Sequence, residues 1–473
     1  MSLFTQKGEL ILLTARKKIK RKKEIKLWAK DLKKYFQTQK NPIMKLLKGD
    51  IFVKAVDDIN FEIKQGEVFG IVGESGSGKT TVGENVLMLQ EPTEGQLYYE
   101  ISKNTKRRIL KAEENDDQEL LDKLNKKYSL RYRENLRELR NDIQMIFQDP
   151  SASLNPSMTV YQAIAHPVKI HNMAIDKKEE KKIVHDIMNE VGLSPPSRFD
   201  NVFPRDLSGG QKQRVVIARA MVLNPSFIVA DEPVAMLDMS IRSKILRLLM
   251  NLKEELDLTF LLITHDLATA KFVCDRIAIM YLGKIVEVGD AKEIFQNPKH
   301  PYTKLLLDTI PRADPNKKSV RKSIPTGEIP DPINVPHGCR FHPRCLESTP
   351  TCGWSAEDLK NYIDRNLLDI LSEKEIEETD LQMEVDEEEN ALLIPYHQKV
   401  WNYVKEKIRE GEENWVKAIE EWDTGDFEIS KNLKEQIFGN ENKDNVMKVV
   451  FKDVDEPELK EVEGVKVACV LYE

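Results

Sequence analysis

The sequence is poor in cysteine and has no long hydrophobic run. Five cysteines among 473 residues are too few for a disulfide scaffold. No stretch of about 18 or more apolar residues occurs, which argues against a membrane-spanning helix. A short apolar patch at residues 10–13 is followed by basic residues, the reverse of a secretory signal. The length of 473 residues predicts two or three domains. The lack of a membrane span and of a secretory signal leads us to expect that the chain stays in the cytoplasm.

The net charge of −7 conceals two regions of opposite sign. Residues 353–460 hold 30 acidic and 14 basic residues, so the first 352 residues are net basic. This split predicts a core with an added acidic module. Residues 1–26 form a basic arm, which we interpret as a solvated tail. Contact with anionic lipid headgroups is the alternative, and no motif for specific nucleic-acid binding accompanies the charges.

Residues 73–80 match the phosphate-loop pattern, with two glycines at the required spacing followed by Lys79 and Thr80. A short apolar run precedes them and a segment able to start a helix follows them. A Gly/Ser turn with a surface lysine is the alternative, and it leaves these flanking patterns unexplained. In a phosphate loop, glycines let backbone N–H groups turn toward a phosphate at a helix N-terminus. The predicted ATP-binding residues are Gly73, Ser75, Gly76, Ser77, Gly78, Lys79, Thr80 and Thr81.

Three further segments end in polar residues that suit phosphate chemistry. The apolar run 227–230 ends in Asp231, which suits Mg²⁺ coordination, and Glu232, which suits orientation or activation of water. A strand followed by an acidic turn is the alternative. The run 143–147 ends in Gln148, and the run 259–264 ends in His265. Because ligands of parallel α/β sheets bind at the carboxyl edge, we expect these side chains to meet there.

These motifs, the segment 207–211 and Asp238 follow one another along the chain at suitable separations. Together they resemble the ATP-binding cassette of ABC transporters over residues 27–312. The resemblance implies an α/β fold with a RecA-like core and a helical subdomain at about 150–215. It also implies that Tyr35 stacks on adenine, that Gln148 senses Mg²⁺ and that His265 is the γ-phosphate switch. Magnesium would then be held through Thr80, Gln148 and Asp231. The residues implied to serve the ATP of a partner cassette are Ser208, Gly209, Gly210 and Gln211.

A narrower resemblance points to the ATPase subunits of oligopeptide/dipeptide importers. The segments that carry it are 148–150, 153–160, 300–305, 327–334 and 338–345. It implies ATP hydrolysis on the cytoplasmic face of the membrane, with a second related cassette, two multi-span permeases and an extracytoplasmic binding protein as partners. Oligosaccharide or nickel as cargo is the alternative within the family. A soluble ABC ATPase acting on DNA or ribosomes is the alternative outside it, but long heptad runs and a second cassette are lacking.

Four cysteines occur in the C-terminal part, Cys339, Cys345, Cys352 and Cys469. Four thiolates suit a [4Fe–4S] cluster, which the resemblance implies, and they suit Zn²⁺ equally; free reduced thiols are the remaining alternative. In this reading 313–354 and 455–473 form a cysteine-containing region interrupted by an acidic insert, 355–454. Trp401, Trp415 and Trp422 predict a helical core for that insert.

Overall fold

The computed structural model describes residues 24–38, 51–132, 136–309, 329–371, 383–386, 390–395, 397–410, 416, 418–425, 446–452 and 454–472. The chain divides into two compact units. Unit 1 comprises residues 1–285 and 290–292, and unit 2 comprises 286–289 and 293–473. Most of the basic arm, residues 1–23, lies outside the described residues. None of the helices in the described part of the chain has the length and apolar character needed to span a bilayer.

Unit 1 contains a three-stranded antiparallel sheet in the order β2-β1-β4. Its strands are β1 (Ile25–Gln37), β2 (Phe52–Lys64) and β4 (Glu94–Ile101). The charged stretch after β4 forms the helices α4 (Lys103–Glu114), α5 (Gln118–Tyr128) and α6 (Leu136–Asp142). Leu124 and Ile109 share a small core with Trp28 and Tyr98, which attaches α4 and α5 to the sheet.

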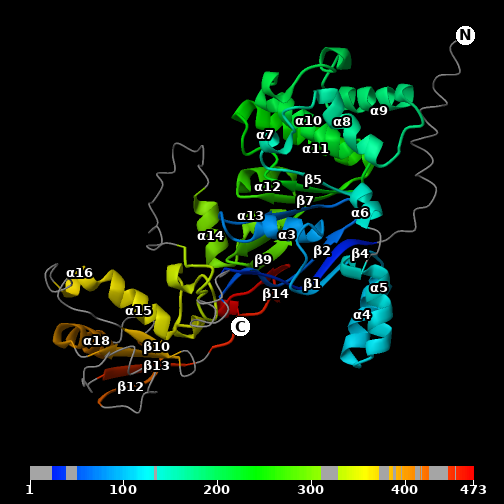
Figure 1. Ribbon diagram of the computed structural model, residues 1–473. Helices are drawn as coiled ribbons and strands as arrows, with labels where there is room; N and C mark the ends of the chain where they lie inside the picture. The colour runs from blue at the N-terminus through cyan, green and yellow to red at the C-terminus, as the bar shows by residue number, and fades with distance from the viewer. Residues whose placement is uncertain are drawn as a thin grey trace, which may run out of the picture. The chain divides into compact units, whose positions relative to one another are not determined.

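A parallel sheet forms the centre of unit 1, with the strands β8-β3-β7-β6-β5 side by side (Figure 1). The strands are β3 (Val68–Val72), β5 (Ile143–Ile146), β6 (Phe227–Asp231), β7 (Thr259–Thr264) and β8 (Arg276–Tyr281). Every residue of β3, β6 and β7 is buried, as expected for strands covered on both faces. In this register Val72 lies beside Thr264, and Asp231 lies beside Ile263. The phosphate loop and the acidic pair therefore leave the sheet at the same edge.

Helices surround this sheet. The helix α3 (Lys79–Val86) follows the phosphate loop, and α11 (Met239–Leu256) and α12 (Leu267–Val273) follow β6 and β7. Four helices between β5 and β6 make the helical subdomain seen at the top of Figure 1: α7 (Pro150–Ser153), α8 (Val160–Ile170), α9 (Lys177–Glu190) and α10 (Gly209–Met221). One continuous core of buried aliphatic side chains joins this subdomain to β6 and β7. The predicted α/β cassette architecture is confirmed.

Unit 2 begins within β9 (Lys284–Asp290) and contains most of α13 (Ala291–Gln296) and all of α14 (Pro301–Asp308). The hairpin of β14 (Lys460–Val462) and β15 (Val465–Val467) pairs with β9 through residues 287–289. The end of the chain therefore returns to the segment where unit 2 starts.

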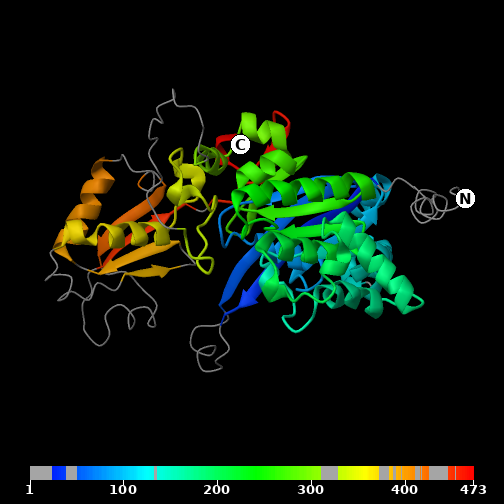
Figure 2. The same ribbon diagram turned by 90° about the horizontal axis from the view of Figure 1, so that it is seen from above.

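The acidic insert is not the helical module that its tryptophans predict. It has the helices α15 (Ala356–Arg365), α16 (Leu367–Ile370) and α18 (Gln398–Glu410), whose buried side chains share a core with an antiparallel sheet (Figures 1 and 2). The sheet order is β10-β11-β13-β12, with β10 (Glu384–Asp386), β11 (Ala391–Pro395), β12 (Ile419–Gly425) and β13 (Val446–Phe451).

Only one of the three tryptophans in the insert lies in a described helix. Trp401 is buried in α18, whereas Trp422 belongs to the strand β12, and Trp415 lies outside the described residues. The prediction was wrong because tryptophan spacing does not distinguish a helix from a strand. The short apolar runs that form β11 and β13 are the features of the insert sequence that indicate strands.

Candidate ATP site

The phosphate loop joins β3 to α3, and two of its glycines are required by close backbone approach. A Cβ on Gly73 would lie 2.1 Å from the carbonyl oxygen of Met280, and one on Gly78 would lie 1.9 Å from that of Ala55. Gly78 also has a φ of 98°, in the left-handed region that favours glycine. The loop is thus pressed against two neighbouring segments, which leaves its backbone N–H groups at the N-terminus of α3.

Lys79 is the first residue of α3 and is buried. Its ammonium donates to the carbonyl oxygen of Glu74 at 2.6 Å and to Ser77 Oγ at 3.3 Å. Burial lowers the pKa of Lys79, and the carboxylates of Glu232, Asp231 and Glu74 oppose this shift. Oxygen acceptors thus surround the ammonium inside the loop, which is the environment that a phosphate would also supply.

Thr80 and Asp231 place two hard oxygen donors side by side. Thr80 Oγ1 donates to Asp231 Oδ1 at 3.3 Å, although the two residues are 151 positions apart in the chain. Burial, together with the charge of the neighbouring Glu232, raises the pKa of Asp231 to about 6 against the opposing effects of Thr80 and Lys79. A hydroxyl beside a buried carboxylate is suited to Mg²⁺, which prefers oxygen ligands and stabilises ionised carboxylates. These residues therefore fit the predicted magnesium ion.

Glu232 is held between the two other residues predicted to be catalytic. Gln148 Nε2 donates to Glu232 Oε2 at 3.0 Å, and His265 Nδ1 lies 2.7 Å from Glu232 Oε1. The backbone N–H of Glu232 donates to the carbonyl oxygen of Ile263 at 2.8 Å, and its φ of 43° lies in the left-handed region. The structure thus brings together the ends of β5, β6 and β7, as the edge argument predicted.

The signature residues form a helix start. Ser208 is the N-cap of α10, where Gln211 N donates to Ser208 Oγ at 3.4 Å and Ser208 N donates to Gln211 Oε1 at 2.9 Å. This is a capping box. Gly210 packs closely on α11, since a Cβ there would lie 2.8 Å from Ile241 Cγ2. The role of 208–211 toward a partner cassette stays a prediction.

Tyr35 lies on β1, and its phenol donates to the carboxylate of Asp57 on β2. Its backbone N–H donates to Thr93 Oγ1 at 3.0 Å. Asp57 is 7% exposed. Sequence reasoning missed Asp57, because its contact with Tyr35 depends on the register between two long strands, and only Tyr35 carried a family signal.

The four cysteines converge although the acidic insert separates Cys352 from Cys469. Burial raises the pKa of Cys339 to about 12, with smaller contributions from the thiolate forms of Cys469, Cys352 and Cys345, which therefore lie within electrostatic range of it. Cys339 Sγ also lies 4.0 Å from Nε2 of the buried His300. However, among the residues described, no three or more His, Cys, Asp or Glu side chains are grouped so that they could hold a metal ion. The predicted iron–sulfur cluster has no support beyond this convergence.

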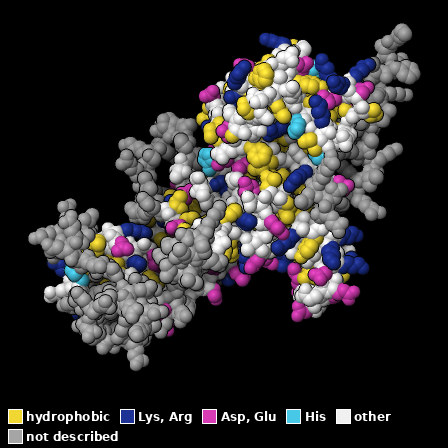
Figure 3. All heavy atoms as spheres, viewed as in Figure 1, with side chains coloured by type: hydrophobic (Ala, Val, Ile, Leu, Met, Phe, Trp, Pro, Cys, Tyr) yellow, Lys and Arg dark blue, Asp and Glu magenta, His cyan; other side chains and the backbone are white. Residues whose placement is uncertain are grey.

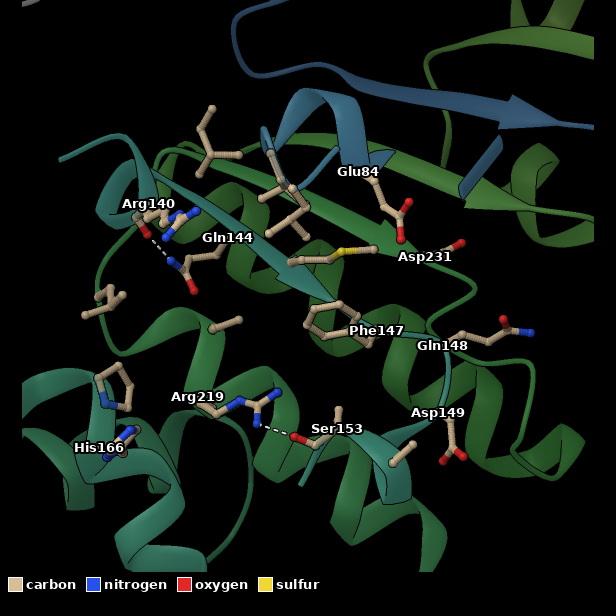
Figure 4. A pocket seen from close by; sticks show the side chains of 18 of the residues that line it. Glu84, Arg140, Gln144, Phe147, Gln148, Asp149, Ser153, His166, Arg219 and Asp231 are labelled. Carbon is tan, nitrogen blue, oxygen red and sulfur yellow. Dashed lines mark hydrogen bonds between the residues drawn. The ribbon is translucent and has the colours of Figure 1, made fainter. Parts of the chain in front are cut away.

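A groove of about 820 Å³ lies between the helical subdomain and the end of β5 (Figure 4). Asp231, Glu84 and Gln148 lie toward one side of it in Figure 4, and Arg140 and His166 lie toward the other. Three of its apolar side chains are well exposed: Leu89, Phe147 and Ile170, at 49%, 40% and 46%. We call this feature the subdomain groove. The segment around Gln148 therefore lies between the candidate ATP site and an open apolar surface.

Two family comparisons cover most of this site and the start of unit 2. Residues 56–235 match the ABC transporter family, and residues 286–352 match the C-terminal region of oligopeptide/dipeptide transporters. A solved dimeric ATP-binding cassette with ADP and Pi bound is also similar, with 28% identity over 56% of this chain and 98% of that chain, at a TM-score of 0.45.

Curated relatives are similar over a longer stretch. A putative oligopeptide transport ATP-binding protein, YkfD of Bacillus subtilis, is 43% identical over 65% of this chain and 86% of its own length. The dipeptide transport ATP-binding protein DppF of Haemophilus influenzae is 38% identical over 71% of this chain and 93% of its own length. This chain is therefore an ATPase that belongs to the family of oligopeptide/dipeptide-type ABC transporter ATP-binding subunits.

Proposed function

We propose that this chain hydrolyses ATP to power the uptake of oligopeptides or dipeptides, as a peripheral subunit on the cytoplasmic face of the membrane. The observation that carries the proposal is the position of Glu232, held by Gln148 and His265 beside the candidate magnesium site. The relatives' names supply the cargo class. Oligosaccharide or nickel as cargo stays an alternative, because the ATPase subunit does not contact the cargo.

Binding of MgATP is assigned to the phosphate loop and its neighbours. The N–H groups of Gly73, Ser75, Gly76, Ser77 and Gly78, followed by Thr80 and Thr81, would bind the phosphates, and Lys79 would place its charge against them. Thr80 and Asp231 would hold Mg²⁺, with Gln148 as the residue that reports its presence. When bound, Mg²⁺ would neutralise charge on the phosphate oxygens. Tyr35 would stack on the adenine.

Hydrolysis is assigned to Glu232. Its carboxylate is fixed by hydrogen-bonding partners on two sides, so one oxygen would accept a hydrogen bond from the attacking water and then its proton. The imidazole of His265 is 56% exposed and is proposed to face the γ-phosphate of the bound nucleotide. The ordered arrangement of these groups supports a role in positioning water, which is the main contribution of the protein to phosphoryl transfer.

A second cassette is proposed to complete the site. The Ser208 hydroxyl and the N-terminus of the 13-residue helix α10 offer hydrogen-bond donors and a positive dipole end to an anion. Gly209 and Gly210 allow close backbone approach there, and Gln211 holds the helix start in shape. A related cassette, in a heterodimer, would therefore contribute its own signature segment to Lys79 and Thr80, and would receive this one in return.

The subdomain groove is proposed as the contact with the two permeases. Its exposed apolar side chains share the groove with Arg140, His166, His171 and Arg219. Figure 3 shows that hydrophobic, basic and histidine side chains are mixed on the face of the protein that it draws. Phe147 lines the groove and Gln148, the next residue, contacts Glu232. A permease segment seated there would thus be coupled to the hydrolytic site through two adjacent residues. An extracytoplasmic binding protein would deliver the cargo.

Affinity purification of the tagged protein from its native membranes tests the proposal. We expect two multi-span permeases, a second cassette and a binding protein to co-purify, and the ligand carried by the binding protein to be a peptide. Nickel or an oligosaccharide bound to that protein would show that the cargo is not a peptide, and would leave the proposed mechanism of ATP hydrolysis unchanged. Nucleic acid or ribosomal proteins without permeases would overturn transport altogether.

A further inference from the structure

Unit 2 has a hollow of about 360 Å³ that no step of ATP hydrolysis uses. It lies where the chain enters and leaves the acidic insert. Trp354 lines it just before α15, and Lys452 and Asp455 line it just after β13. His337 from the cysteine-containing region, Asn390 just before β11, Gly353 and Val454 complete the wall. The volume equals that of about a dozen water molecules at roughly 30 Å³ each, and falls within the range of small-molecule sites.

The three ionisable side chains of this hollow, those of His337, Lys452 and Asp455, are exposed, whereas charged groups near the hollow are paired. Arg340 pairs with Glu456 at 3.0 Å, and the buried His342 pairs with Asp358 at 3.2 Å. By contrast, within the described ranges no hydrogen bond or ion pair engages the side chains of His337, Lys452 or Asp455. Two basic side chains and one carboxylate therefore line the same hollow without a hydrogen bond or ion pair between them.

The remaining wall is rigid. Trp354 Nε1 donates to the carbonyl oxygen of Thr349 at 2.9 Å, and the His342 ring packs edge-on against the indole with centroids 4.7 Å apart. Asn390 Oδ1 accepts from Ala356 N at 3.1 Å, which ties β11 to the first turn of α15. Trp354 and Asn390 are thus already held in place, and a ligand would cost little side-chain freedom at these two positions.

We infer that this hollow binds a small amphoteric ligand, a free amino acid or a short peptide. Lys452 and His337 would bind its carboxylate, Asp455 would bind its ammonium, and the indole of Trp354 would contact its carbon atoms. A simple anion would be repelled by Asp455, and a metal ion would meet Lys452 and a single carboxylate. The inference needs neither ATP hydrolysis nor transport, so it stands or fails independently of the proposed function.

Calorimetric titration of the full-length protein with single L-amino acids and with the dipeptide alanyl-alanine tests this inference. We expect saturable binding by one or more of these probes. Lys452→Gln and Asp455→Asn should each weaken it about tenfold or more, because each removes a charged hydrogen bond. The matched controls Lys466→Gln and Glu461→Gln, on the exposed hairpin, should bind normally. Lys79→Ala should also bind normally, which separates this site from the ATP site.

Three results would overturn the inference. The first is no binding of any probe up to millimolar concentration. The second is binding that neither Lys452→Gln nor Asp455→Asn weakens, which would place the ligand elsewhere. The third is binding of acetate or inorganic phosphate that Lys452→Gln weakens and Asp455→Asn strengthens, which would make the hollow a plain anion site. Hydrogen exchange gives a second measurement: bound ligand should protect residues 452–455 and 354, the two ends of the insert.

Discussion

Replacing Glu232 with glutamine keeps the shape of the side chain and removes its charge and basicity. In the structure one carboxylate oxygen accepts from Gln148 and the other lies beside His265 Nδ1. A glutamine keeps one acceptor oxygen for Gln148, and its NH2 group can contact His265 Nδ1 only in the tautomer where that nitrogen accepts; the amide cannot take a proton from water. General base catalysis contributes about 10²–10⁴ in rate, equivalent to roughly 2.7–5.5 kcal/mol of transition-state stabilisation. We expect turnover to fall by that factor.

Nucleotide affinity should respond differently. The charge of Glu232 acts on Lys79, so a neutral residue removes a negative charge from the region where phosphates would bind. Affinity for MgATP should therefore stay the same or rise slightly in Glu232→Gln. The measurements are phosphate release at saturating MgATP, with the partner cassette present, and equilibrium binding of a fluorescent ATP analogue.

Glu254→Gln is the matched control, because Glu254 is exposed on α11 and has no role in the site. It should turn over ATP at the rate of the unchanged protein. Turnover of Glu232→Gln within about fivefold of that rate would refute the role of Glu232. Loss of turnover together with loss of ATP binding would mean that the variant disrupts the loop, and would refute the separation of binding from hydrolysis.

Three further predictions concern residues outside the acidic pair. Asp57→Ala removes the acceptor of the Tyr35 phenol, so KM for ATP should rise severalfold with kcat little changed; an unchanged KM would contradict adenine stacking by Tyr35 in this orientation. Burial raises the pKa of Glu287, so the folded state keeps a proton that the unfolded state loses, and the free energy of unfolding should fall as pH rises from about 4.3 through the raised pKa. Urea titrations at several pH values should show a smaller fall for Glu287→Gln, and identical falls would contradict the assignment. If the cysteines hold a cluster, protein purified without oxygen should contain iron and sulfide, and Cys339→Ser should lower both; iron-free protein would exclude the cluster.

The phosphate loop and the acidic pair could be predicted because their signals are local. An apolar run, a Gly-rich loop and a helix start between 67 and 86 are each readable within a few residues, and the edge rule for parallel sheets brings Gln148, Asp231 and His265 together without coordinates. Family resemblance added the helical subdomain and the roles of Tyr35, Gln148, His265 and 208–211. The insert was predicted less well, because its sheet pairs short strands that are separated by long stretches of chain.

By itself, the amino-acid sequence determined the cassette, its phosphate chemistry and the acidic character of the insert, because glycine conformation, strand burial and charge are properties of short segments. Only the tertiary structure decided which side chains meet. The contact of Tyr35 with Asp57 depends on strand register. The return of Cys469 to the other cysteines depends on the pairing of β15 with β9, and the hollow with Trp354 and Lys452 depends on where the insert begins and ends. Such contacts join distant segments, and their free energy comes from packing that no single segment encodes.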